Sequence, residues 1–134
     1  MRSVLLLVAL LGLPLPALAA DDVANAQSVI RAQEQALSHN DAAAAYSYAA
    51  PAIRQIFPQA DVFMSMVQQS YEPIYRHRSF EFGEARAADG QVAQRVQIVD
   101  EKGQAWEALY TLEQQSDGSL KIVGCMLIKA GQSV

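Results

Sequence analysis

Residues 78–129 read RSFEFGEARAADGQVAQRVQIVDEKGQAWEALYTLEQQSDGSLKIVGCMLIK, and this stretch decides the fold. Two Asp-Gly pairs, Asp89-Gly90 and Asp117-Gly118, are typical β-hairpin turns, and Glu101-Lys102-Gly103 fits a three-residue hairpin loop. The runs between them are rich in Val, Ile, Phe, Trp and Tyr, which strands favour. The stretch therefore predicts four antiparallel strands in chain order, from Arg78 to Lys129.

Loop length sets the register, and a slip of one residue moves every side chain to the other face. We predict three-residue loops with Gly90 and Gly103 in the left-handed conformation. A two-residue turn at Asp89-Gly90 would turn Phe80 and Phe82 outward, so we prefer the three-residue loop. With a two-residue turn at Asp117-Gly118, the pairs are Phe82–Val96, Phe80–Ile98, Ile98–Trp106, Val96–Ala108, Tyr110–Cys125 and Leu112–Val123. The inner face then holds Phe80, Phe82, Val92, Val96, Ile98, Trp106, Ala108, Tyr110, Leu112, Val123, Cys125 and Leu127.

The last strand is apolar on both of its faces. On the outer face of the sheet we expect the apolar residues Leu109, Leu120, Ile122, Met126 and Ile128. Two interpretations stay open. Scattered surface hydrophobes are common on monomeric proteins, whereas a contiguous patch marks an interface, here a homodimer formed across the sheet.

Length and composition indicate one folded domain. The chain has 134 residues, is 51% hydrophobic and carries a net charge of -4, which is enough apolar material for one core. Basic residues are spread along the sequence, so neither nucleic acid nor an anionic membrane surface is favoured as a partner.

The first nineteen residues have the pattern of a secretory signal peptide. A short basic start precedes the apolar run Val4–Leu13, and Ala17-Leu18-Ala19 fits the small-x-small cleavage rule. The run is too short for a transmembrane anchor. We therefore predict a signal peptide over residues 1–19 and a single exported domain over residues 20–134, periplasmic or secreted and without membrane attachment. Cys125 is the only cysteine, so an internal disulfide is excluded and a buried thiol is expected.

Helical periodicity precedes the strands. Three helices are expected, over residues 21–40, 41–49 and about 61–71, the second capped by Asp41. Residues 52–57 are expected to form a short helical or irregular linker that brings Ile53, Ile56 and Phe57 inward. Helices followed by an antiparallel meander define an α+β fold. The helices must cover the Phe80/Trp106 face, and a twisted sheet wrapped over them forms a cone with a pocket at its wide end.

Three runs carry a resemblance to a known family: NDAAAAYSYAAPAIRQIF, SYEPIYRHRSFEFGEAR and WEALYTLEQQSDGSLKIVGCMLIK. They resemble an exported bacterial family known as domain of unknown function 4864, from about Ala26 to Lys129. That family is similar to the cystatin-like cone of nuclear transport factor 2 and ketosteroid isomerase. The resemblance implies the cone fold, export, a bacterial source and a homodimer. It implies no catalytic residue.

Candidate ligand-binding residues are the aromatic and basic side chains expected around the cone: Tyr46, Tyr71, Tyr75, Arg78, Trp106 and Tyr110. A ketosteroid-isomerase-like site needs a carboxylate base in an apolar pocket, and the preferred register places none near the centre of the inner face. Glu84 is expected inward near a turn, and Asp100 beside Arg78 as an ion pair. His77 would face inward, with Glu81, only in the other register.

No metal site or cofactor is predicted, because His39 and His77 lack partners at ligand spacing. Two functional hypotheses follow. The first is a non-catalytic domain that binds a small apolar or amphipathic molecule in the cone, or a protein partner through the outer sheet face. The alternative is a ketosteroid-isomerase-like or dehydratase-like enzyme for a small molecule, which requires an ionisable residue inside the cone.

Overall fold

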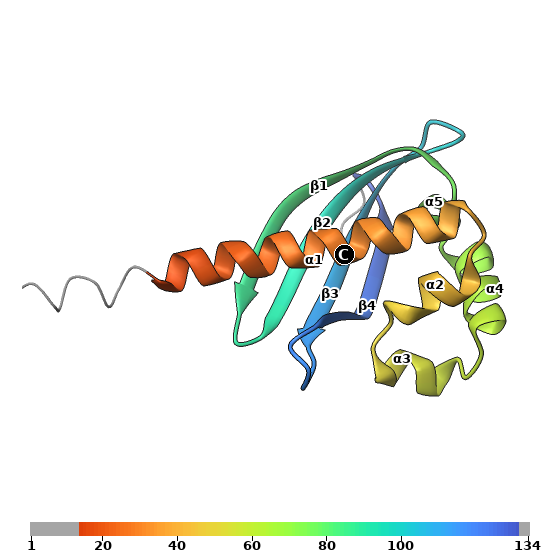
Figure 1. The fold of residues 1–134 in the computed structure, drawn as a ribbon. Coiled ribbons are helices and arrows are strands. Elements are labelled where there is room, and N and C mark those ends of the chain that lie inside the picture. The colour runs from red at the N-terminus through yellow and green to blue at the C-terminus, as the bar shows by residue number, and fades with distance from the viewer. Residues whose placement is uncertain (1–13, 132–134) are drawn as a thin grey trace, which may run out of the picture.

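A long helix lies across a curved sheet, and four short helices gather beyond the last strand (Figure 1). The computed structural model describes residues 14–131, with side chains from residue 19 onward. The helices are α1 (Pro14–Ser38), α2 (Ala42–Ser47), α3 (Pro51–Ile56), α4 (Ala60–Ser70) and α5 (Glu72–Tyr75). The strands are β1 (His77–Ala88), β2 (Gln91–Asp100), β3 (Ala105–Gln114) and β4 (Leu120–Lys129). The predicted α+β fold is confirmed.

The helices form largely where the sequence places them. Asp41 caps α2 by accepting a hydrogen bond from the backbone N–H of Ala44 at 3.1 Å, as expected of an N-cap. Helix α1 begins at Pro14, seven residues before the expected start, with its prolines in the first turn, where a missing N–H costs nothing. Ile56 was expected inward and is 70% exposed. The signal-peptide prediction for residues 1–13 lies outside the described residues.

The strands are hydrogen-bonded in the order β1-β2-β3-β4, and α1 packs across them, contacting β1, β2 and β4. The predicted pairs Phe82–Val96, Phe80–Ile98, Ile98–Trp106, Val96–Ala108 and Tyr110–Cys125 are confirmed. The loop after β1 differs from the prediction. It is a two-residue turn with Asp89 at φ 54 and Gly90 at φ 77, the geometry that suits the twist of a hairpin.

A β-bulge reconciles this shorter turn with inward phenylalanines. Between Phe82 and Ala85 the register shifts, so that Gly83 and Glu84 together oppose one residue of β2. Glu84 is consequently exposed rather than inward. Gln94 of β2 is fully buried and donates from Nε2 to the carbonyl oxygens of Gly83 at 3.0 Å and Glu84 at 3.2 Å. A polar side chain that the sequence did not single out therefore stabilises the bulge.

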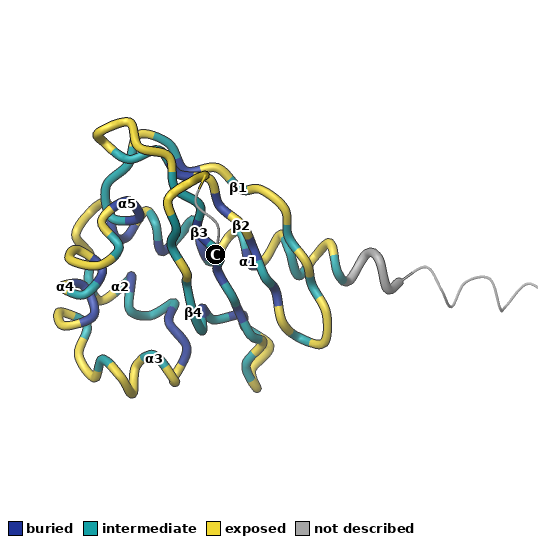
Figure 2. The backbone as a smooth tube through the Cα atoms, turned by 180° about the vertical axis from the view of Figure 1, so that it is seen from behind, coloured by how far each residue is buried: buried dark blue, intermediate teal, exposed yellow. Residues whose placement is uncertain are grey.

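A second β-bulge changes which residues of β4 lie on the outer face of the sheet. The register shifts between Thr111 and Leu112, and Leu112 pairs with Ile122 instead of Val123. Ile122 and Leu120 consequently face the core, 4% and 8% exposed, so their predicted outer positions were wrong. Figure 2 shows the buried segments along the strands and the exposed turns at their ends. The apolar residues left on the outer face are Leu109, Met126 and Ile128, with Met126 53% exposed.

Within residues 14–131, no helix combines the length and the apolar character needed to cross a membrane.

Candidate functional site

A cavity of about 260 Å³ lies between the helices and the inner face of β3 and β4. Its helical side comes from α1, α3, α4 and α5, and its sheet side from Tyr110 and residues 122–125. Most of the wall is apolar, as in small-molecule sites generally. The lining residues are Gln33, Leu37, Ala49, Ile53, Phe57, Phe63, Met66, Val67, Tyr71, Ile74, Tyr110, Ile122, Val123, Gly124 and Cys125.

The polar groups of this cavity are neutral. Burial raises the pKa of Tyr110 well above its ordinary value, and burial likewise raises the pKa of Cys125 to about 12. The pKa of Tyr71 is raised by burial and then by the neighbouring Cys125. The side-chain amide of Gln33 already has a hydrogen-bond partner, because its Nε2 donates to the backbone oxygen of Ala45 at 3.2 Å. None of the described residues that line the cavity is charged at neutral pH, so the cavity suits an apolar occupant.

A wider groove of about 1060 Å³ adjoins the cavity. Tyr71 and Cys125 line both, and a hydrogen bond of 3.1 Å from the Tyr71 hydroxyl to the Cys125 backbone oxygen joins them. The remaining wall combines charged and polar side chains with apolar ones. It comprises Gln69, Ser70, Glu72, Pro73, Asp100, Lys102, Gly103, Gln104, Trp106, Met126, Leu127 and Lys129.

Trp106 is fixed in the groove by Asp100. Its Nε1 donates to Asp100 Oδ2 at 2.9 Å, and the other carboxylate oxygen accepts the backbone N–H groups of Lys102 and Gln104. These bonds, the one from Trp106 first, lower the pKa of Asp100. Arg78 is not the ion-pair partner expected for Asp100, since its Nη2 donates to the Glu101 backbone oxygen at 2.8 Å.

The structure brings only part of the predicted ligand-binding set together. Tyr71 and Tyr110 line the cavity, and Trp106 lines the groove. Tyr46 stands behind the cavity wall, where its ring packs on Phe63 and its hydroxyl donates to the Phe57 backbone oxygen at 2.6 Å. Two others lie elsewhere: Tyr75 hydrogen-bonds Asn40 and stacks with Arg76, and Arg78 is exposed.

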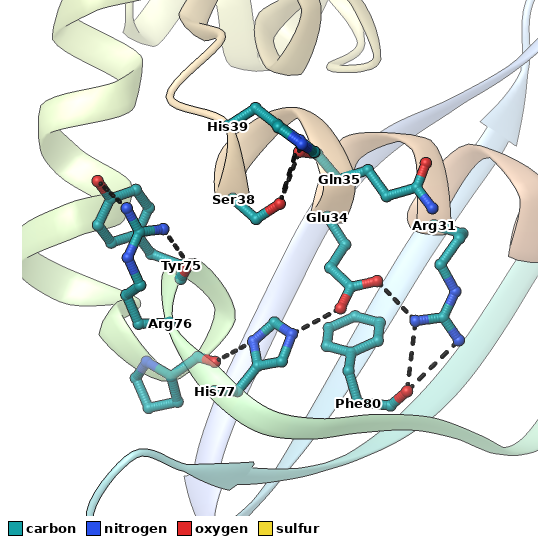
Figure 3. Close-up of polar contacts among 10 residues, drawn as sticks. Arg31, Glu34, Gln35, Ser38, His39, Tyr75, Arg76, His77 and Phe80 are labelled. Carbon is teal, nitrogen blue, oxygen red and sulfur yellow. Dashed lines mark hydrogen bonds and ion pairs between the residues drawn. The ribbon is translucent and has the colours of Figure 1, made fainter.

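Sequence reasoning missed a polar network between α1 and β1 (Figure 3). Glu34 lies 2.6 Å from both Arg31 and His77, and the side chains of Glu34 and His77 are each only 12% exposed. His77 Nδ1 lies 2.9 Å from the Pro73 backbone oxygen. Both ring nitrogens face oxygen acceptors, so the ring either carries two hydrogens or shares one with the Glu34 carboxyl group.

Arg31, Glu34 and His77 are not among the residues that line the cavity or the groove. Glu34 follows Gln33 and precedes Leu37 by about one helical turn, so it lies beside the buried stripe of α1. This position was the one signal in the sequence that could have identified Glu34. No comparable signal existed for His77, because a bulge at Arg78 turns it toward the helix. Among residues 14–131, no group of three or more His, Cys, Asp or Glu side chains is arranged to hold a metal ion.

An antiparallel sheet covered by helices, with a neutral apolar cavity between the two layers, defines a small α+β domain with a hollow core. Comparison with protein families agrees on the particular family. Residues 15–133 match the model described as Domain of unknown function (DUF4864), and the chain belongs to that family. A search of curated proteins found no match.

Proposed function

We propose that this domain binds a small apolar or amphipathic molecule in the cavity between α4 and β4. The observation that carries the proposal is the composition of the cavity wall. The wall surrounds about 260 Å³ and is apolar apart from neutral hydroxyl, thiol and amide groups. Such a wall solvates a charge poorly and favours hydrocarbon.

The enzyme alternative gains no support from the cavity. A general base has to reach the substrate's proton, and no carboxylate or histidine is among the described cavity-lining residues. Glu34 and His77 lie elsewhere and already contact each other at 2.6 Å. The ketosteroid-isomerase-like activity therefore stays a prediction that no observation here favours.

A matched pair of substitutions tests the binding proposal. Val67 and Val62 lie on the same helix, α4, but Val67 lines the cavity at 6% exposure whereas Val62 is 44% exposed. Val67→Phe directs a ring into the empty volume, and Val62→Phe adds the same ring to the surface. The readout is fluorescence titration with N-phenyl-1-naphthylamine, an uncharged apolar probe.

We expect the wild-type protein and Val62→Phe to bind the probe alike, and Val67→Phe to bind at least tenfold more weakly. Thermal melts show whether Val67→Phe is folded, and Ile53→Phe, on a different helix that lines the cavity, repeats the test independently. Undiminished probe binding by both cavity variants would overturn the proposal.

Two further proposals accompany this one. We propose export with removal of residues 1–19, which N-terminal sequencing of the secreted protein tests. An N-terminus other than Ala20 would contradict the cleavage site.

We also propose a homodimer formed through the outer-face residues Leu109, Met126 and Ile128, supported by the exposure of Met126.

A further inference from the structure

The cavity and the groove differ in chemistry, although two residues line both of them. Tyr71 and Cys125 belong to both, and one hydrogen bond of 3.1 Å between them crosses the boundary. On one side the wall is neutral and apolar. On the other side it carries Lys102, Lys129 and Glu72. A molecule that fills both spaces has to be apolar at one end and polar at the other.

The charges of the groove favour an anionic end near Trp106. Lys129 Nζ lies 5.8 Å from the centroid of the Trp106 ring, and neither Lys129 nor Lys102 forms an ion pair with any described residue. Asp100, the carboxylate on that side, already accepts hydrogen bonds from Trp106 and two backbone N–H groups. Glu72 belongs to the opposite, helical wall. The two lysines are therefore available to a ligand carboxylate.

The volume of the cavity limits the length of the apolar end. A methylene group takes about the same space as a liquid water, roughly 30 Å³. The cavity of about 260 Å³ thus accommodates an unbranched chain of roughly eight carbons.

We propose that the cavity and the groove form one site for a single-chain carboxylate of about eight carbons, its chain in the cavity and its head beside Lys102 and Lys129. This inference rests on the proposed function, because the chain occupies the same cavity. Tyr71 lies at the boundary between the two spaces, because it lines both of them.

Octanoate and octan-1-ol separate the two proposals, because they have the same chain and differ in the charge of the head. The assay measures how well each compound displaces N-phenyl-1-naphthylamine from the wild-type protein at neutral pH. A neutral cavity alone prefers the alcohol, since burying a carboxylate costs free energy. With the lysines engaged, we expect octanoate to bind at least tenfold more tightly than octan-1-ol.

The double variant Lys102→Met/Lys129→Met keeps the length of both side chains and removes their charge. We expect it to lose the preference for octanoate while its affinity for octan-1-ol changes less than twofold. Lys121→Met is the control, because Lys121 also lies on β4 but donates to the Ser47 backbone oxygen, away from the groove. It should leave both affinities unchanged.

The outcomes distinguish failure of the inference from failure of the proposed function. If octan-1-ol binds as tightly as octanoate, or if the lysine variant retains the preference, the head-group inference is wrong and the apolar cavity site stands. If neither compound displaces the probe and Val67→Phe binds the probe undiminished, both proposals fail.

Discussion

Glu34 of α1 and His77 of β1 form a largely buried contact, each side chain 12% exposed, with Oε2 and Nε2 2.6 Å apart across 43 residues of sequence. The contact joins the long helix to the first strand of the sheet it covers. Arg31, one turn earlier on α1, holds the other carboxylate oxygen at 2.6 Å and stacks over Phe80 and Phe82. Polar and apolar contacts thus fix the same helix–strand junction.

Glu34→Gln should destabilise the protein. Removing one partner of a buried pair leaves the other without compensation, which costs about 3 kcal/mol in the free energy of unfolding. Glu107→Gln is the matched control, since the Arg95–Glu107 pair has the same kind of geometry at 2.8 Å but is 47% and 34% exposed. It should cost less than about 1 kcal/mol. Urea unfolding measures both, and equal losses would show that the Glu34 contact is no stronger than a surface pair.

Gln94→Ala should cost about 2–3 kcal/mol, because it removes a fully buried side chain that donates hydrogen bonds to the carbonyl groups of the Gly83–Glu84 bulge. It also removes the acceptor of Gln27, whose Nε2 lies 3.0 Å from Gln94 Oε1. Gln97→Ala, on the exposed face of the same strand, should change stability by about 0.5 kcal/mol or less. The two variants are compared by chemical denaturation. Similar effects at both positions would contradict the assigned role of Gln94.

The thiol of Cys125 should make stability depend on alkaline pH. Its pKa is raised to about 12 in the folded protein from an ordinary 9.0. The stabilising contribution is therefore complete below pH 9 and is lost as the pH rises toward 12, because only the unfolded chain ionises there. Between pH 9 and 11 the loss is about 2 kcal/mol.

Cys125→Ala isolates this effect. Tyr110 and Tyr71 also have raised pKa values, and they remain in the variant. Unfolding free energies of the wild-type protein should fall more steeply than those of Cys125→Ala above pH 9. Parallel pH profiles would mean that the thiol ionises equally well in the folded and unfolded states.

Met126→Lys tests the homodimer. Met126 is paired with Leu109 across β3 and β4 and is 53% exposed, so a lysine here places two charges at the centre of the interface in a symmetric dimer. We expect the wild-type protein to sediment as a dimer and the variant as a monomer. Ile56→Lys, at a 70% exposed position on α3, is the control. A wild-type monomer would remove the outer-face proposal.

The pattern of apolar residues and turns in the strand region predicted most of the fold. Apolar alternation and glycine turns were sufficient for the strand order, the phenylalanines facing inward and the pairing of Tyr110 with Cys125. They did not reveal the bulges at Arg78, Gly83–Glu84 and Val123, since a bulge adds one residue without changing composition. These bulges account for the misplaced Ile122, Leu120 and Glu84 and for the unexpected contact of His77 with α1.

The candidate site was predictable only in part. Tyr71, Tyr110 and Trp106 were identified because aromatic residues on an inner face border any remaining space. Their division between a cavity and a groove depends on where Tyr71 meets the backbone of Cys125, a contact across 54 residues.

The sequence by itself determined the α+β class, the antiparallel order of the strands and the face that the helices cover, because these follow from local periodicity and turn chemistry. Only the tertiary structure decided which polar side chains are buried and where space remains. Gln94 is buried, and Glu34 and His77 are largely covered, because packing and bulges supply them with partners from distant segments. The cavity exists because the described helices and strands that surround it meet without filling the volume between them, and no local pattern records that volume.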